Sequence, residues 1–419
     1  MADLPLGVLG RSAIAWVSDR GQISFADGSP DLAWHVAADD RWHDPSREAA
    51  VRRTDRGGLP VVSTRMRIPG GDVVHTAWCV VGPRGPVVVV EIENDSPMAI
   101  AVAFTRTDLS LSRAGTSGVT DGRWPAPGLR LDAPPTVVPI GHRSIVRLAV
   151  APDVDVSGLP STDAVAAGWS KVLEASSRLV LPDRVGGEPI EDRVARAKVA
   201  IALGGPFEPS RDADELAHWL LDRFHAARLG AWATDDHEVA AAVERIVRAS
   251  RRSGLDPLRA TAVRAAATWL SASEPRVLDD VAAAVSRVAG SAAGIDGVRL
   301  VDDGSLRRGA LVSAVEESLV CWLGDDRVAL CPDAPTPDRL GASFEGHGIA
   351  LPRGARASLA VRWHGANAAV LWELSLPTVR LSSAFDREWS SSEPSGESLW
   401  RVGRVDSGPA PVGDSVSFG

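Results

Sequence analysis

Several residue types are scarce in this chain of 419 residues, and some of these scarcities exclude a class of function. No tyrosine occurs, so a phenolic general acid or nucleophile is excluded. The three cysteines, Cys79, Cys321 and Cys331, are an odd number at wide spacing, which fits neither a disulfide framework nor a CxxC metal site. Cys79 and Cys321 stand beside tryptophans in apolar runs, which is typical of small buried residues. Only two lysines, Lys171 and Lys198, accompany 43 arginines, a bias that indicates a high-GC genome.

Long apolar runs are also missing. No stretch of eighteen apolar residues occurs, so we expect no membrane-spanning helix. The first residues lack the basic cluster and apolar core of a secretory signal. The formal net charge is −9 and the basic residues are dispersed, which disfavours nucleic acid as a partner. These features predict a cytoplasmic protein that binds neither nucleic acid nor membranes.

Motifs for common cofactors are absent as well. The nine histidines never follow an HxH or HExxH spacing, so we expect no metal site. No GxGxxG or GxxxxGK[ST] motif stands between a strand and a helix, which disfavours nucleotide binding. No GxSxG nucleophile elbow is present either. We therefore expect a protein without a cofactor.

Strand patterns dominate residues 1–155. Residues 61–68 alternate between polar and apolar side chains, which predicts a strand with one wet and one packed face. Tight turns rich in Gly, Pro, Asn and Asp separate this strand from the next ones. Such short strands at close spacing predict an antiparallel β-sandwich. The other predicted strands cover residues 73–81, 87–93, 99–105 and 144–150.

The pattern changes to helical between residues 160 and 324. Apolar residues recur at i, i+3, i+4 and i+7 in about seven segments, which predicts amphipathic helices joined as antiparallel hairpins. The clearest cover residues 214–229, 239–250, 258–269 and 277–288, and a last one covers 306–323.

Strand patterns return in residues 325–386. Residues 357–364 and 368–374 flank Gly365, Ala366 and Asn367, which predicts a hairpin in a small C-terminal β domain. Residues 387–419 are rich in Ser, Gly and Pro without periodicity, so we expect a tail that follows the surface or is partly disordered.

Four short segments resemble a known group of proteins. RIPGGDVV at 67–74, VVEIENDSP at 89–97, RWHG at 362–365 and VLWE at 370–373 are similar to the glycogen-debranching-like and glucoamylase-like proteins of actinobacteria. That resemblance implies a six-hairpin (α/α) toroid between two β domains, acting on an α-linked glucan or a similar glycan. Because this chain has room for about seven helices, the resemblance implies a partial toroid.

Glycoside hydrolysis needs two carboxyl groups roughly 5 to 9.5 Å apart, one of them protonated. The candidates in the helical region are Asp235, Asp236, Glu316 and Glu317. Acids in the first turn of a helix also stabilise the helix dipole, which is the alternative interpretation of Asp235 and Asp236. Glu316 and Glu317 stand in the middle of a predicted helix, where capping does not explain them.

The aromatic set is dominated by fourteen tryptophans beside seven phenylalanines. Indole faces stack on the C–H faces of sugars, so tryptophans in loops are candidate glycan contacts. Trp34, Trp42, Trp124 and Trp232 stand in predicted loops, and His364 belongs to the RWHG segment. The alternative is that these aromatics fill the interface between the sandwich and the helices.

Three functional hypotheses follow. The first is a carbohydrate-active protein, in its catalytic form an inverting glycoside hydrolase with two carboxylates. The second is a non-catalytic pseudoenzyme on the same shortened scaffold, which serves as a glycan-binding or assembly subunit in a homo-oligomer or with a partner subunit. The third is a purely structural partner. The reduced number of helices favours the second hypothesis.

Overall fold

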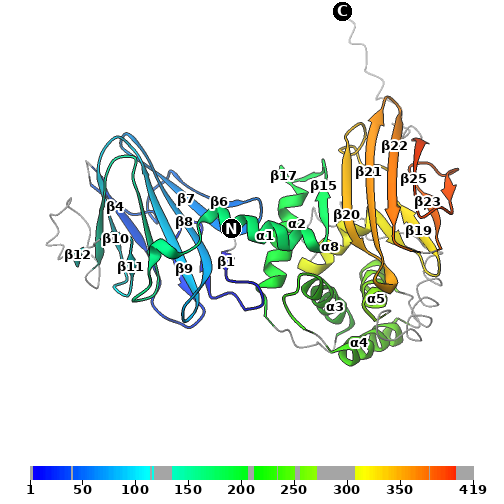
Figure 1. The fold of residues 1–419 in the computed structure, drawn as a ribbon, viewed down its shortest axis with the longest axis horizontal. Helices are drawn as coiled ribbons and strands as arrows, with labels where there is room; N and C mark the ends of the chain where they lie inside the picture. Colours follow the sequence, from blue (N-terminus) through cyan, green and yellow to red (C-terminus); the bar gives the residue numbers. More distant parts are fainter. Residues whose placement is uncertain are drawn as a thin grey trace, which may run out of the picture.

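The structure is a computed structural model in three successive parts, a β-rich N-terminal part, a group of helices and a β-rich C-terminal part (Figure 1). This order agrees with the mixed α and β class predicted from the sequence. The structure describes residues 3–38, 41–113, 116–117, 135–205, 212–233, 235–250, 255–270, 307–376 and 378–402.

Antiparallel sheets build the N-terminal part, and their arrangement fits a β-sandwich. One sheet has the order β12 (Thr116–Ser117), β13 (Thr136–Ile140), β10 (Ile100–Phe104), β4 (Trp34–Ala37) and β5 (Trp42–His43). The second has the order β11 (Ser110–Leu111), β14 (Ile145–Ala149), β9 (Gly85–Asp95), β8 (Gly71–Gly82), β7 (Leu59–Ile68) and β6 (Val51–Arg56). A small third sheet contains β1 (Leu4–Leu6), β2 (Ala15–Val17) and β3 (Ile23–Phe25).

Alternation along β7 explains how the sandwich core forms. Val62, Met66 and Ile68 are buried in the core, whereas Arg65 and Arg67 are exposed. Full burial of one such aliphatic side chain stabilises the fold by about 1.5–3 kcal/mol. The strands predicted at residues 61–68, 73–81, 87–93, 99–105 and 144–150 correspond to β7, β8, β9, β10 and β14 and are confirmed.

The outer face of the same sheet is covered by α1 (Thr162–Ser176). Trp78 of β8 is fully buried there, and its indole N–H donates to the carbonyl of Pro160 at 3.3 Å. The helix begins at Ser161, whose side chain accepts a hydrogen bond from the N–H of Ala164. A short 3-10 helix, η1 (Val156–Gly158), lies between β14 and α1 in the chain. The apolar cluster between sheet and helix contains Val61, Trp78, Val80, Val89 and Ala166.

Six α-helices occur in the described part of the chain. The predicted helices at 214–229, 239–250 and 258–269 are confirmed, and the one predicted at 277–288 lies outside the described residues. The last predicted helix, 306–323, was too long, because β18 (Val320–Trp322) leaves the helix axis to pair with β19 (Arg327–Leu330). Besides α1 the helices are α2 (Ile190–Ala202), α3 (Ala213–Arg228), α4 (Asp236–Ala249), α5 (Pro257–Leu270) and α8 (Arg308–Glu317).

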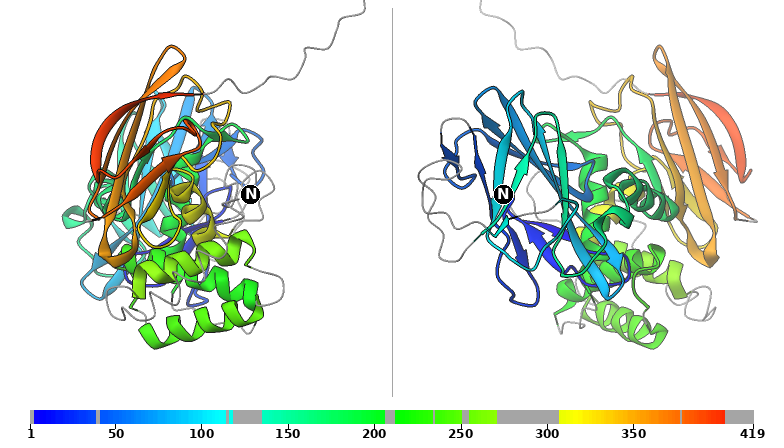
Figure 2. Two further views of the ribbon diagram at one scale, coloured as in Figure 1. Left: turned by 90° about the vertical axis from the view of Figure 1, so that its right-hand side faces the viewer. Right: turned by 60° about the vertical axis from the view of Figure 1, so that its left-hand side comes forward.

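Two sheets build the C-terminal part, and α3, α4 and α5 lie at one end of them (Figures 1 and 2). One sheet has the order β15 (Arg178–Val180), β20 (Phe344–Ala350), β21 (Arg356–His364), β22 (Asn367–Leu374) and β25 (Ser395–Arg401). The other has the order β18, β19, β23 (Arg380–Ser383) and β24 (Ser390–Ser391), with β19 and β23 parallel. The hairpin predicted at residues 357–374 is confirmed as β21 and β22. The remaining short elements are the pair β16 (Arg184–Val185) and β17 (Glu188–Pro189) and the 3-10 helix η3 (Pro352–Gly354).

Two strands of the C-terminal part were not predicted from the sequence. Strand β15 follows α1 directly, so the C-terminal sheet begins well before the predicted boundary at residue 325. Strand β25 lies in the segment predicted as a tail from residue 387, so that prediction was wrong for residues 387–402. Aromatic contacts hold this segment, because the ring of Trp389 lies 5.2 Å from that of Trp372 in an edge-to-face contact and 5.0 Å from that of Trp400 in a tilted one.

The hairpin between β6 and β7 touches α2 through a glycine. Gly58 is buried at φ +79°, and a Cβ at this position would lie 2.4 Å from the carbonyl oxygen of Asp192. Gly57 also has a positive φ of +62°, but its nearest neighbour, a carboxylate oxygen of Asp192, would be 3.6 Å away. Close approach of the sandwich to α2 therefore depends on Gly58.

We expect Gly58→Ala to destabilise the protein more than Gly57→Ala. Both variants carry the left-handed backbone penalty of roughly 1–2 kcal/mol. Gly58→Ala adds a clash with α2, which costs about 1–3 kcal/mol more. Urea denaturation of both variants measures the difference, and equal midpoints would contradict this packing.

Candidate functional site

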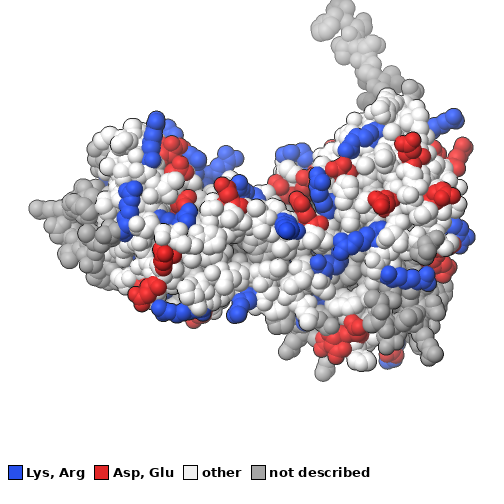
Figure 3. All heavy atoms as spheres, in the orientation of Figure 1, with Lys and Arg blue, Asp and Glu red and all other residues white. Residues whose placement is uncertain are grey.

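A cleft of ≈ 570 Å³ lies between α1, α2, the β6–β7 hairpin and β15, and we call it the α1–α2 cleft. Its walls come from all three parts of the chain, and ligand sites favour such junctions. Figure 3 shows a hollow between the two β-rich parts, with acidic and basic side chains interspersed over it. The polar residues that line the cleft are Arg56, Asp163, Ser170, Glu174, Ser177, Arg178, Glu191, Asp192 and Lys198.

The floor of this cleft is the carbonyl end of α1, which is buried. The last carbonyls of a helix lack partners within the helix, so burial requires donors from elsewhere. Lys198 of α2 donates to the carbonyls of Ser177 at 2.8 Å and Leu173 at 3.4 Å and to the hydroxyl of Ser177 at 2.8 Å. Arg228 of α3 donates to the carbonyl of Ser176. Two cations therefore cap the negative end of the helix dipole.

Glu316 of α8 is the counter-ion of both cations. Its carboxylate is 4% exposed, accepts a hydrogen bond from Arg228 at 2.6 Å and accepts another from the hydroxyl of Ser177. Burial alone would raise the pKa of Glu316, but the nearby charges of Arg228 and Lys198 outweigh it and lower that pKa to about 2. Glu316 is therefore ionised and fully engaged.

The other titratable groups of this network are held in defined states. Burial lowers the pKa of Lys198 to about 8, against the opposing attraction of Glu316. Burial also lowers the pKa of His225 to about 3, so its ring is neutral. Because Arg228 can only donate to Nδ1 of this ring, Nε2 carries the proton and donates to the hydroxyl of Ser313 at 2.8 Å.

Glu317 is adjacent to Glu316 but has different partners. It accepts hydrogen bonds from Arg264 at 2.7 Å and from the hydroxyl of Thr261 at 2.7 Å. The predicted catalytic use of Glu316 and Glu317 finds no support in this geometry, because each carboxylate is occupied by an arginine. A general acid also needs a raised pKa, whereas the pKa of Glu316 is lowered.

Asp235 and Asp236 also have structural roles. Asp235 is the N-cap of α4 and accepts a hydrogen bond from the N–H of His237 at 2.9 Å. Asp236 accepts from the indole N–H of Trp269 at 2.9 Å. The alternative interpretation of this pair, as first-turn acids, agrees with these contacts.

Two of the tryptophans predicted to contact a ligand lie in strands of the sandwich instead of a loop. Trp34 of β4 is 2% exposed and stacks on His75 at 5.1 Å. Trp42 of β5 is 7% exposed and packs against alanines and Val137. The strand pattern was missed because these strands are short and Trp34–Ala37 is buried on both faces.

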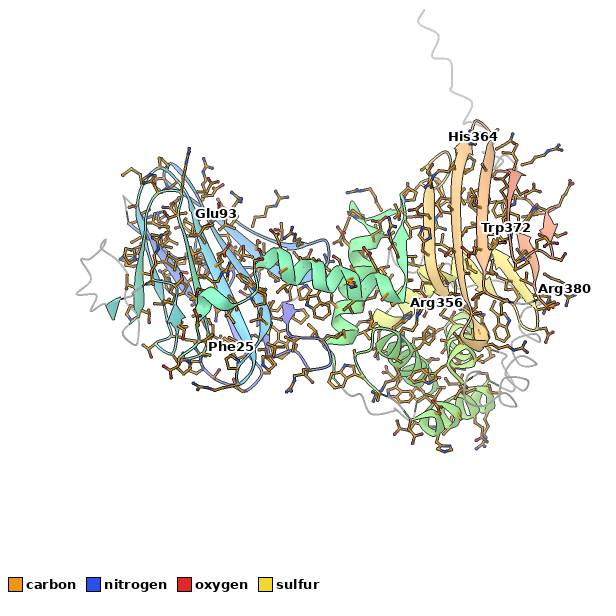
Figure 4. The ribbon with its side chains drawn as sticks, in the orientation of Figure 1. Phe25, Glu93, Arg356, His364, Trp372 and Arg380 are labelled. Atoms are coloured by element: carbon orange, nitrogen blue, oxygen red, sulfur yellow. The ribbon has the colours of Figure 1, made fainter. Side chains whose placement is uncertain are left out.

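The remaining candidates lie elsewhere. Trp232 donates to the carbonyl of Ala202 at 3.1 Å and packs against the core of the helices. His364 is exposed at the tip of the β21–β22 hairpin, at the end of β21 opposite Arg356 (Figure 4). Trp124 lies outside the described residues. A shared tryptophan-lined glycan site therefore finds no support among the described residues.

Sequence reasoning missed Lys198, Ser177 and Arg228. One signal was available, because Lys198 is one of only two lysines and interrupts the apolar stripe of α2. It also missed Glu174 and Asp192, two carboxylates of the cleft that accept no hydrogen bond from the described residues. The pKa of Asp192 is raised, first by burial and then by the nearby carboxylates of Asp55 and Glu188.

Comparisons with known proteins add no assignment. A scan against protein-family models and a search of curated proteins both gave no match. Within the described ranges, no group of three or more His, Cys, Asp or Glu side chains is placed to hold a metal ion. None of the helices in the same ranges is long and apolar enough to cross a bilayer.

We expect Glu316→Gln to destabilise the fold by about 3–5 kcal/mol, because it leaves Lys198 and Arg228 as buried cations without a counter-ion. Glu244→Gln is the control, since Glu244 forms an exposed ion pair with Arg248 on α4 and such pairs contribute little. Urea denaturation at pH 7 compares the two variants. A loss below about 1 kcal/mol for Glu316→Gln would contradict the counter-ion role.

Acid should destabilise the protein through His225. Its folded pKa of about 3 lies below the ordinary value of 6.5, so between these values the unfolded chain binds a proton that the folded chain does not. The free energy of unfolding therefore falls with decreasing pH, by about 1.4 kcal/mol per pH unit for this group. His225→Gln should reduce the slope between pH 6 and about 4.5 by that amount, relative to the unaltered protein. Denaturation at several pH values measures both slopes.

Proposed function

We propose that this chain is a carbohydrate-binding protein that does not hydrolyse its ligand, built on a shortened relative of the six-hairpin scaffold. The observation that carries the proposal is that each of the four predicted catalytic acids already binds another group of the protein. Glu316 and Glu317 each bind an arginine, Asp235 caps a helix and Asp236 holds a tryptophan. Each of the four carboxylates therefore has a structural partner in the fold.

The α1–α2 cleft is the proposed binding site. Sugar hydroxyls donate and accept hydrogen bonds, so a polar cleft with both kinds of partner suits them. Glu174 and Asp192 supply acceptors that no described residue occupies. Arg178 on β15 supplies donors at the same wall, held by Glu345 at 3.7 Å.

Apolar side chains complete the cleft. Leu59, Ala166, Leu173 and Val194 line it beside the polar groups, so the C–H faces of a sugar have apolar surface to cover. No aromatic side chain lines the cleft in the described part of the chain. Affinity would then rest on hydrogen bonds to the carboxylates rather than on stacking, which makes Glu174 and Asp192 the residues to vary.

We expect the protein to bind an α-linked gluco-oligosaccharide without releasing reducing sugar. Glu174→Gln and Asp192→Asn should each weaken binding by roughly 10-fold, because hydrogen bonds to charged groups contribute about 1.5–3 kcal/mol. Isothermal titration calorimetry measures binding, and a reducing-sugar assay over long incubation measures turnover.

His364→Ala is the matched control, because His364 is exposed far from the cleft (Figure 4). Release of reducing sugar that disappears in Asp192→Asn would refute the non-hydrolytic proposal and identify a catalytic carboxylate. Failure of a glycan panel to bind at all would refute carbohydrate binding and leave the assembly role.

A further inference from the structure

A second hollow of ≈ 270 Å³ lies between the C-terminal ends of α3 and α5 and the segment around η3. It differs from the α1–α2 cleft in charge. Its described lining contains two arginines and no acidic side chain, whereas both acidic and basic side chains line the cleft. The residues that matter here are Phe224, Arg228, Thr268, Trp269, Gly354 and Arg356.

Trp269 gives this hollow a fixed aromatic wall. Its indole N–H donates to Asp236 at 2.9 Å, so the ring is oriented before any ligand arrives. Phe224 lies in the same wall, and the guanidinium of Arg228 stands 5.2 Å from its ring centre. Such a wall offers a flat apolar face to a ring-shaped ligand.

Arg356 supplies directed donors beside that wall. Arg356 is exposed, and one of its Nη atoms donates to the carbonyl of Ala175 at 3.0 Å, which anchors the side chain and leaves other N–H groups for a ligand. Arg228 adds positive charge at the edge of the hollow, but its two Nη groups already donate to Glu316, His225 and the carbonyls of Ser176 and Gly348. A guanidinium fork matches carboxylate and phosphate oxygens in geometry as well as in charge.

The backbone of η3 shapes the opposite side. Arg353 and Gly354 both have left-handed conformations, with φ +62° and +70°. A non-glycine residue in this region is uncommon and persists only where its surroundings hold it. This turn brings the backbone of Gly354, which has no side chain, to the edge of the hollow.

We propose that this second hollow binds a small organic anion whose carboxylate or phosphate is carried on a ring, such as a uronic acid or a sugar phosphate. The anionic group pairs with the N–H groups of Arg356 that face solvent, and the ring lies against Trp269. The proposal does not depend on carbohydrate binding in the α1–α2 cleft.

Calorimetry with glucuronate, glucose 6-phosphate, glucose and inorganic phosphate at constant ionic strength tests this site. We expect at least one of the two ring anions to bind, and the tighter one identifies the anionic group. Glucose and inorganic phosphate should each bind at least tenfold more weakly, because glucose lacks the anionic group and phosphate lacks the ring. Equal affinity for glucose, or for phosphate alone, would overturn the proposal, as would the absence of binding by both ring anions.

Arg356→Gln should weaken binding of the ring anion by about tenfold or more, because it removes a charge-assisted hydrogen bond at an exposed position. Arg362→Gln, on the same strand and also exposed, is the matched control and should bind normally. Trp269→Phe keeps a ring and should bind more tightly than Trp269→Leu. Glu174→Gln, which alters the cleft, should leave this site unchanged. Unaltered binding in Arg356→Gln would place the ligand elsewhere.

Discussion

The buried carbonyl end of α1 is the point on which the three parts of this molecule depend. The helix packs against the sandwich with one face and ends beside the C-terminal sheet, so water cannot satisfy its last carbonyls. Lys198, from α2, and Arg228, from α3, donate to these carbonyls instead. Two buried cations would repel each other without Glu316 of α8, which binds Arg228 and the hydroxyl of Ser177. Four helices are thereby held by one group of charges.

This constraint also determines what the acids of the helical region can do. A carboxylate that compensates buried cations has a lowered pKa and no free oxygen for a substrate, so it is unsuited to general acid catalysis. The same charges border both proposed sites. Lys198 and Ser177 line the α1–α2 cleft, while Arg228 lines the second hollow. The two sites therefore border the same group of charges, but the cleft presents side chains of both signs, whereas the described lining of the second hollow has no acidic side chain.

Much of the secondary structure follows from local pattern. The alternation of residues 61–68 predicted β7, and the helical spacing of residues 214–229 predicted α3. Prediction failed where burial on both faces removed the alternation, as in β4, or where long-range pairing formed a strand from polar sequence, as in β25. The helix predicted to end at 323 stopped at Glu317 because β18 pairs with β19, a contact that helical periodicity does not report.

The amino-acid sequence by itself determined the order of β-rich, helical and β-rich parts, because strand and helix periodicities are local properties. It also marked Glu316 as an acid that helix capping does not explain, and Lys198 as a rare lysine. Only the tertiary structure decided their roles. Ser177 and Glu316 are 139 positions apart, and Arg228 and Glu316 are 88 apart, so their contacts arise from packing. The partner of a buried charge depends on which helices meet, and no spacing along the chain encodes that.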